Sequence, residues 1–165
     1  MVTYDYANWT WGTETAYAGS TSINSAYPLN TVYCASNQKW YCFGVGTGST
    51  TPNVVSVADS PVDVTQAPAF GAFTEITGIN GSSKIVDVVI LGNNFVAVDT
   101  GSTIYTAPIS APNTFTQVAY NISGQWSRMC VVNGTLYLWT STGTSFVKWC
   151  TDPAGTWTSA SSNLN

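Results

Sequence analysis

The fold is decided by residues 87–118, "DVVILGNNFVAVDTGSTIYTAPISAPNTFTQV", because residues 128–160 repeat their pattern as "RMCVVNGTLYLWTSTGTSFVKWCTDPAGTWTSA". In each copy two apolar runs flank a short turn, Asn93-Asn94 in the first and Asn133-Gly134 in the second. Asn and Gly accept the positive φ angles that two-residue hairpin turns require. Gly101 and Gly143, forty-two residues apart, then mark a second turn. The pattern predicts four strands per unit, with a proline-containing loop before the last.

A longer copy of the unit comes earlier in the chain. It begins with "TVYCASNQKWYCFGVG" at residues 31–46, and its extra length falls in "GTGSTTPN" and "PVDVTQAP", which are rich in loop residues. Residues 7–10, "ANWT", resemble an isolated last strand. We therefore predict one domain, 1–165, in which an N-terminal strand and irregular docking segment (1–30) precede repeat units at 31–79, 80–122 and 123–164.

Period-2 alternation and an enrichment in β-branched and aromatic residues predict an all-β protein. Four-stranded units that recur every 40 to 50 residues are typical of β-propeller blades. A β-sandwich is the alternative, if the strands only imitate blades. Three blades are too few to close a ring, since propellers usually have 4 to 8. The sequence therefore predicts assembly with copies of itself or with another protein.

Residues 151–157, "TDPAGTW", approximate the fingerprint of Asp-box (BNR) repeats, in which Ser or Thr, Asp and Gly precede Thr-Trp. The Gly stands one position away from its usual place. The chain thus resembles the β-propeller repeats of that group, and the resemblance implies that the box is a structural turn. An aromatic followed by Thr recurs at forty-two-residue intervals, and we predict structural roles for these aromatics, Phe73, Phe115 and Trp157.

Composition argues against several classes of function. Only 7% of residues are charged, against roughly 25% in ordinary domains. The four cations are too few for the phosphate contacts of nucleic-acid binding. The chain has no His, which removes the usual general base and the Ser-His and Cys-His pairs, and makes a zinc site very unlikely. We predict no enzymatic activity, no cofactor and no metal site.

The cysteines leave two interpretations open. Cys34 and Cys42 flank a tight turn and could form a disulfide, or all four cysteines, including Cys130 and Cys150, are buried thiols. The N-terminal residues lack the basic and apolar regions of a signal peptide, and no apolar run reaches the roughly 18 residues of a membrane helix. These patterns predict synthesis in the cytoplasm and no membrane partner.

Aromatic residues divide into two groups by their surroundings. Trp40, Trp139, Trp149 and Trp157 lie in strand patterns and are assigned to the core. Trp9, Trp11, Tyr17 and Tyr27 lie in the irregular first thirty residues. We predict that the second group forms a protein interface.

In composition and architecture the chain is similar to accessory structural proteins of tailed bacteriophages, such as capsid decoration, head-fibre and tail-fibre proteins. The resemblance implies a non-enzymatic virion protein, made in the host cytoplasm, with copies of itself and other virion proteins as partners. The alternative is a carbohydrate-binding propeller or lectin-like module that recognises a host-surface glycan. It is favoured by the 22 aromatic residues and the abundant Asn and Thr, which suit sugar binding.

Overall fold

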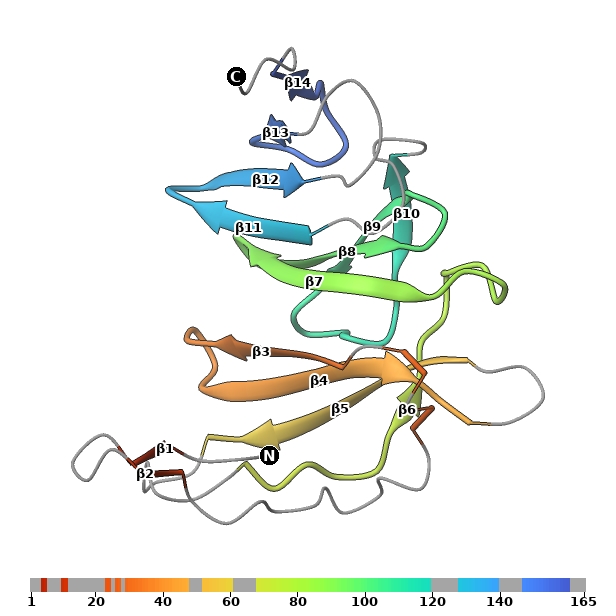
Figure 1. Ribbon diagram of the computed structural model, residues 1–165, viewed down its shortest axis with the longest axis vertical. Helices are drawn as coiled ribbons and strands as arrows, with labels where there is room; N and C mark the ends of the chain where they lie inside the picture. Colours follow the sequence, from red (N-terminus) through yellow and green to blue (C-terminus); the bar gives the residue numbers. More distant parts are fainter. Residues whose placement is uncertain are drawn as a thin grey trace.

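The computed structural model describes residues 4–5, 10–11, 23–24, 26–27, 29–47, 52–60, 68–119, 128–139 and 147–160. In these ranges the regular structure is all-β, with three four-stranded antiparallel sheets and one two-stranded sheet. The three larger sheets are stacked along the long axis of the molecule (Figure 1). None of the described segments is a helix long and apolar enough to cross a membrane. The prediction of an all-β fold with three four-stranded units is confirmed.

Each four-stranded sheet is one blade, and its strands pair in sequence order. Blade 1 contains β3 (Asn30–Cys34), β4 (Lys39–Val45), β5 (Asn53–Asp59) and β6 (Thr74–Glu75). Blade 2 contains β7 (Ile85–Leu91), β8 (Asn94–Asp99), β9 (Ile104–Pro108) and β10 (Thr116–Ala119). Blade 3 contains β11 (Arg128–Val132), β12 (Thr135–Trp139), β13 (Val147–Cys150) and β14 (Thr158–Ser159). The short strands β1 (Tyr4–Asp5) and β2 (Thr10–Trp11) pair with each other and belong to no blade.

The first hairpin of each repeat differs slightly between blades 2 and 3. In blade 3, Asn133 (φ 49°) and Gly134 (φ 74°) form the predicted turn. In blade 2 the turn lies at Gly92-Asn93 rather than at the predicted Asn93-Asn94, because Asn94 is already the first residue of β8. Gly92 has a φ of 59°, and this positive angle costs less free energy at a glycine than at an asparagine.

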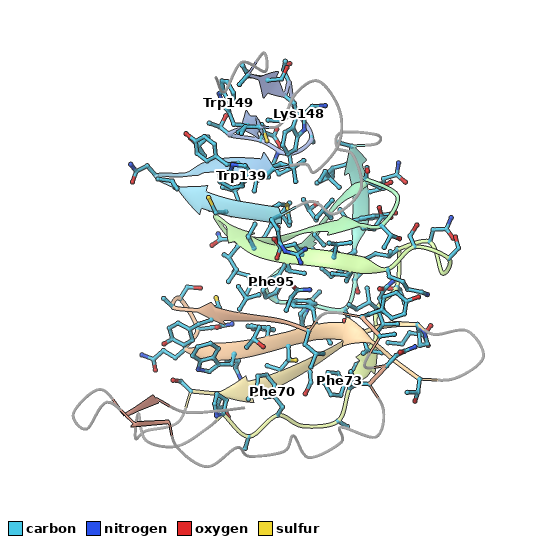
Figure 2. All side chains as sticks on the ribbon, in the orientation of Figure 1. Phe70, Phe73, Phe95, Trp139, Lys148 and Trp149 are labelled. Atoms are coloured by element: carbon cyan, nitrogen blue, oxygen red, sulfur yellow. The ribbon has the colours of Figure 1, made fainter. Side chains whose placement is uncertain are left out.

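The first strands of successive blades, β3, β7 and β11, are neighbours, so that the blades stack face to face. Core 1 lies between blades 1 and 2. In it the ring of Phe43 meets Phe95 edge-on at 5.1 Å and Phe115 at 6.1 Å. Phe95 is labelled between β7 and β3 in Figure 2. Core 2 lies between blades 2 and 3, where Val98 and Leu138 are fully buried.

Hydrogen bonds from one buried side chain and from the backbone join blade 1 to blade 2. The side chain of Asn53, only 3% exposed, donates to the Ser83 carbonyl at 2.9 Å and accepts from the Ile85 amide at 2.9 Å. The Thr77 amide, just after β6, donates to the Asn113 carbonyl at 2.8 Å. Such directional bonds fix the rotation between adjacent blades, which apolar packing alone does not specify.

The face of blade 1 that points away from blade 2 is covered by its own chain. Residues 68–73 run across it, and Phe70, 5% exposed, packs on Cys42 and Ala58. Figure 2 labels Phe70 and Phe73 on this side of blade 1. The Ser56 hydroxyl donates to the Gly71 carbonyl at 2.8 Å and so ties the segment to β5. Blade 1 is therefore closed on its outer side.

All four cysteines are free thiols. Cys34 belongs to core 1, whereas Cys42 lies on the opposite face of blade 1. The possible Cys34–Cys42 disulfide therefore does not form. Cys130 is only half-buried, which differs from the expectation of four buried thiols.

Candidate functional site

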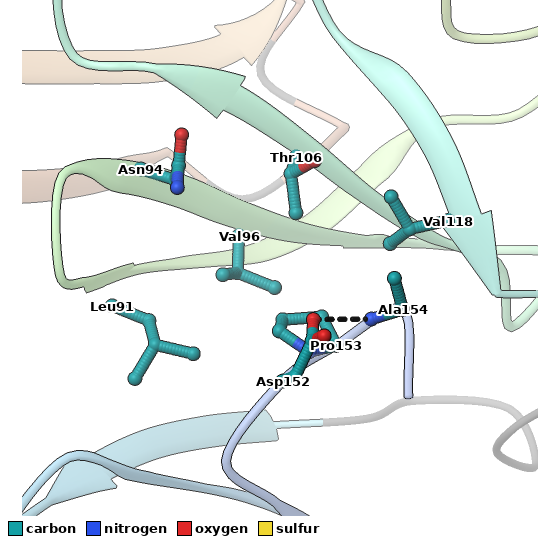
Figure 3. Close-up of a pocket in the computed structure, with 8 residues that line it drawn as sticks. All are labelled: Leu91, Asn94, Val96, Thr106, Val118, Asp152, Pro153 and Ala154. Atoms are coloured by element: carbon teal, nitrogen blue, oxygen red, sulfur yellow. Dashed lines mark hydrogen bonds between the residues drawn. The ribbon is translucent and has the colours of Figure 1, made fainter. Parts of the chain in front are cut away.

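A cavity of about 130 Å³ lies between blade 2 and the turn that connects β13 to β14 (Figure 3). We call it the interblade cavity. Its lining comes from all four strands of blade 2 or their ends and from one turn of blade 3: Leu91, Asn94, Val96, Thr106, Val118, Asp152, Pro153 and Ala154. In Figure 3 the side chains of Leu91, Val96 and Val118 border the space around Pro153.

Strand alternation explains the blade 2 side of the cavity. Asn94 and Val96 are two residues apart on β8, so that their side chains share one face of the sheet. Thr106 pairs directly with Val96 in the ladder between β8 and β9 and therefore lies on the same face. This face points toward blade 3, because Val96 belongs to core 2.

A rigid turn forms the blade 3 side. The Asp152 Oδ1 atom accepts from the Ala154 amide at 3.0 Å, and the Asp152 carbonyl accepts from the Gly155 amide at 3.0 Å. An Asp that bonds the backbone two residues ahead is an ordinary turn device. The indole Nε1 of Trp157 donates to the Pro153 carbonyl at 3.1 Å and holds the turn against core 2.

The lining combines apolar walls with polar groups. Leu91, Val96 and Val118 provide the walls. The side-chain amide of Asn94 and the hydroxyl of Thr106 make no hydrogen bond to another residue in the described ranges. Asp152 uses only Oδ1 in its turn, which leaves Oδ2 as an acceptor. At about 30 Å³ per water, the cavity equals roughly four waters. It suits one small ring that has an apolar side and hydroxyl groups.

A second polar feature lies where the first strands of blades 2 and 3 meet. The Asp87 carboxylate of β7 accepts from the Val88 amide at 2.9 Å and from the Met129 amide of β11 at 2.7 Å. Arg128 reaches back to the Val86 carbonyl at 3.4 Å. Burial raises the pKa of the Asp87 carboxyl above its usual value, although both backbone hydrogen bonds and the nearby Arg128 charge act in the opposite direction.

The raised pKa of Asp87 has a measurable consequence. We expect the Asp87 carboxyl carbon to titrate by NMR with a midpoint above 3.8, the ordinary value. Because the folded pKa is the higher one, the folded protein retains the proton in this window, and stability falls as the pH rises through it. In Asp87→Asn the corresponding resonance should stop titrating and this part of the pH dependence should vanish. A midpoint at or below 3.8 would contradict the burial argument.

The other described acids have local roles. Asp59 forms an exposed ion pair with Lys39 at 2.7 Å. Asp99 is 3% exposed, and both its oxygens accept hydrogen bonds from its own blade. Glu75 is exposed on β6. Within the described ranges, no three His, Cys, Asp or Glu residues come close enough to share a metal ion.

The aromatics of the repeat occupy equivalent places, each directly before the last strand of its blade. Phe115 is 3% exposed and belongs to core 1, whereas Trp157 is half-buried beside core 2. Phe73 is half-buried beside Phe70 on the outer side of blade 1. Each ring thus packs on the side of its blade that faces the N-terminal end of the stack.

The residues predicted to form a protein interface are described only in part. Trp9, Tyr17 and the side chain of Trp11 lie outside the described residues. Tyr27 is half-buried, and nearby Ile23 forms a β-bridge with Gly46 at the end of β4. This end of the N-terminal segment is therefore held by blade 1 of the same chain. The interface role of the four aromatics stays a prediction.

Solved structures that share this fold include carbohydrate-active enzymes. An exo-β-1,3-galactanase from Phanerochaete chrysosporium, solved with galactose, matches with a TM-score of 0.55 and 12% identity over 93% of this chain and 41% of that chain. A variant of the same enzyme with β-1,3-galactotriose gives 0.54 and 12%, with the same coverage. A GH43 β-1,3-galactosidase with galactodeoxynojirimycin gives 0.51 and 11%, over 93% of this chain and 65% of that chain.

The likeness shows the fold alone, because the identity is low and the chain spans only 41% of the galactanase. GH43 enzymes are five-bladed β-propellers, and the three sheets of this chain are propeller-like blades. No protein-family model matches the sequence, and no curated protein matches it either.

The comparison contradicts two predictions made from the sequence, that the chain is a structural protein of a bacteriophage particle and that it is not an enzyme. The solved structures named above, which share its fold, are glycosidases. Both predictions rested on composition and on the missing His. A neutral surface rich in Thr, Ser and Asn suits carbohydrate-active proteins equally well, and glycosidases use carboxylates rather than His.

Proposed function

We propose that this chain is a carbohydrate-binding β-propeller protein whose interblade cavity holds one galactose-type sugar unit. The observation that carries the proposal is the lining of the cavity, where apolar walls meet the free hydrogen-bonding groups of Asn94, Thr106 and Asp152. A pyranose ring has this same division, with C–H groups on one side and hydroxyls at its edge. The match to structures solved with galactose and β-1,3-galactotriose supports the choice of sugar.

The geometry suggests how the sugar is held. The C–H side of the ring packs on Leu91 and Val96, while its hydroxyls bond to the Asn94 amide and the Thr106 hydroxyl. Asp152 is exposed and its Oδ2 accepts a hydroxyl proton at the mouth of the cavity. The cavity takes only part of one sugar unit, so that the rest of a glycan chain extends into solvent and the terminal sugar is the part recognised.

Binding can be tested by titrating galactose and β-1,3-galactotriose into the protein and following amide shifts by NMR. We expect saturable shifts at Asn94, Thr106 and Ala154. Thr106→Val, which keeps the shape of the side chain, should weaken binding about 5- to 30-fold, since one lost hydrogen bond costs about 1–2 kcal/mol. Thr158→Val, at an exposed position on β14, is the matched control and should bind normally.

Shifts that are absent at all three positions, or equal affinity in Thr106→Val and the parent protein, would refute the interblade cavity as the sugar site. Melting temperatures of both variants must match the parent for the comparison to hold. Glucose in place of galactose tests the preference, because the two differ only in the orientation of one hydroxyl.

Hydrolysis of the same sugar is a second candidate function, favoured by Asp87. A glycosidase needs a general-acid carboxyl with a raised pKa, and burial raises the pKa of the half-buried Asp87 carboxyl. It also needs a second carboxylate about 5–10 Å away. Asp99, on the strand next to β7, accepts hydrogen bonds at both oxygens, as Asp87 itself does, so that either carboxyl must exchange a partner to act on a substrate. Galactose release from a β-1,3-galactan that Asp87→Asn abolishes, with NMR binding unchanged, would establish this activity.

A further inference from the structure

The face of blade 3 that points away from blade 2 is apolar and uncovered by the described chain. Strand register places six residues on it: Cys130 and Val132 from β11, Tyr137 and Trp139 from β12, and Val147 and Trp149 from β13. We call it the aromatic face. Val132 is 51% and Trp139 41% exposed, and the other members are half-buried. The exposure of Trp139 differs from its predicted place in a core; Figure 2 labels it together with Trp149.

The equivalent positions in blades 1 and 2 show the role of the residues on the aromatic face. In blades 1 and 2 the third and fifth residues of the second strand point toward the following blade. They are Tyr41 and Phe43 in blade 1 and Val96 and Val98 in blade 2, each at most 2% exposed. In blade 3 the same positions belong to the aromatic face. The face is therefore a blade-stacking surface that continues the series of cores 1 and 2 without a following blade in the described chain.

A repeat array normally ends in a unit with a polar outer surface. Blade 1 follows a related solution, since residues 68–73 cover its outer side. The aromatic face carries no comparable cover in the described ranges, and its two rings on β12 lie 6.2 Å apart with an interplanar angle of 31°. A sugar site needs several polar groups beside the rings, and in the described ranges Arg128, Thr135 and Thr158 are the polar residues that share the face, all at its edges. The dry surface favours a protein partner.

We propose that the aromatic face binds the same face of a second copy of this chain, as a two-fold symmetric dimer. Head-to-tail stacking would require the outer side of blade 1, which its own chain already fills. Contact between the aromatic faces of two copies meets no such obstacle. A two-fold axis allows one surface patch to bind the same patch of the other copy. Among the described residues Arg128 is the charged one on the face; it lies at the edge across from Trp139 and bonds the Val86 carbonyl of β7, so that the centre of the face stays apolar.

The test is a concentration series of the full chain by sedimentation equilibrium. We expect the parent protein to dimerise, and Trp139→Glu to raise the dissociation constant at least tenfold, because it places a charge within a desolvated contact. Tyr33→Glu is the matched control: Tyr33 is 42% exposed, like Trp139, but lies on blade 1. It should dimerise like the parent.

If Trp139→Glu fails to fold, Val132→Glu tests the same face at its most exposed member. A parent protein that stays monomeric to about 100 µM, at which a weak dimer would be populated, would overturn the proposal. So would a dimer that survives both substitutions. A monomeric parent whose retention on immobilised β-1,3-galactan is lost in Trp139→Glu would show that the face is a glycan platform instead.

Discussion

Replacing Phe95 with alanine is expected to lower the free energy of unfolding by about 3–5 kcal/mol, among the largest effects of any single substitution in the chain. Phe95 is fully buried in core 1, where its ring meets Tyr41 at 4.7 Å and Phe43 at 5.1 Å. Alanine leaves a cavity between two blades that polar contacts hold at a fixed angle, so that the blades cannot close over it. Urea unfolding should show a lower midpoint with an unchanged slope.

Two controls accompany this measurement. Phe95→Leu keeps most of the apolar volume and should cost clearly less than alanine, about 1–1.5 kcal/mol. Tyr33→Ala, at a position 42% exposed, should change stability by about 0.5 kcal/mol or less. A cost below about 1 kcal/mol for Phe95→Ala would mean that core 1 does not hold the two blades together.

Asp99→Ala is expected to cost about 3–5 kcal/mol, because it leaves several buried donors without an acceptor. Asp99 Oδ1 accepts from the Gly101 and Thr103 amides at 2.8 Å each, and Oδ2 accepts from the Tyr105 hydroxyl at 3.0 Å. Asp152→Ala is the matched control. It removes a similar turn bond at an exposed position and should cost about 1 kcal/mol or less.

The same variant has a spectroscopic signature. Burial, followed by the Asp99 charge and its hydrogen bond, raises the pKa of Tyr105 to about 12. Removing the carboxylate should bring the phenol titration, followed by ultraviolet absorbance, to lower pH. Equal stability of Asp99→Ala and Asp152→Ala would indicate that the bonds to Asp99 are replaced by water.

The blade pattern could be predicted from the sequence because its signals are local. Asn133-Gly134 fixes a hairpin, and alternation on both sides of it fixes two strands. The blade 2 hairpin was predicted one residue too late, since Gly92, Asn93 and Asn94 all tolerate turns and only the register of β7 with β8 decides between them. Local chemistry therefore predicts that a turn exists more reliably than where it lies.

The candidate site could not be predicted in the same way. Asn94 and Asp152 are 58 positions apart in the sequence, and the cavity exists only because blade 3 stacks its turn on the face of blade 2. One part of the site could have been predicted, because the side chains of Val96 and Thr106 lie on the same face of blade 2. The exposure of Trp139 could not be predicted from the sequence for a related reason. Alternation shows which residues share a face, but not whether another sheet covers that face.

The central position of blade 2 also determines how the chain comes apart. Its β8 strand contributes alternate residues to core 1 and core 2, Phe95 to the first and Val96 to the second. Opening this strand would expose both cores at once, so its amide protons exchange only when the whole stack unfolds. Blade 3 has one face that the described residues leave uncovered and a last strand of two residues, and can fray alone. The stack therefore loses structure from its C-terminal end, while the middle blade unfolds last.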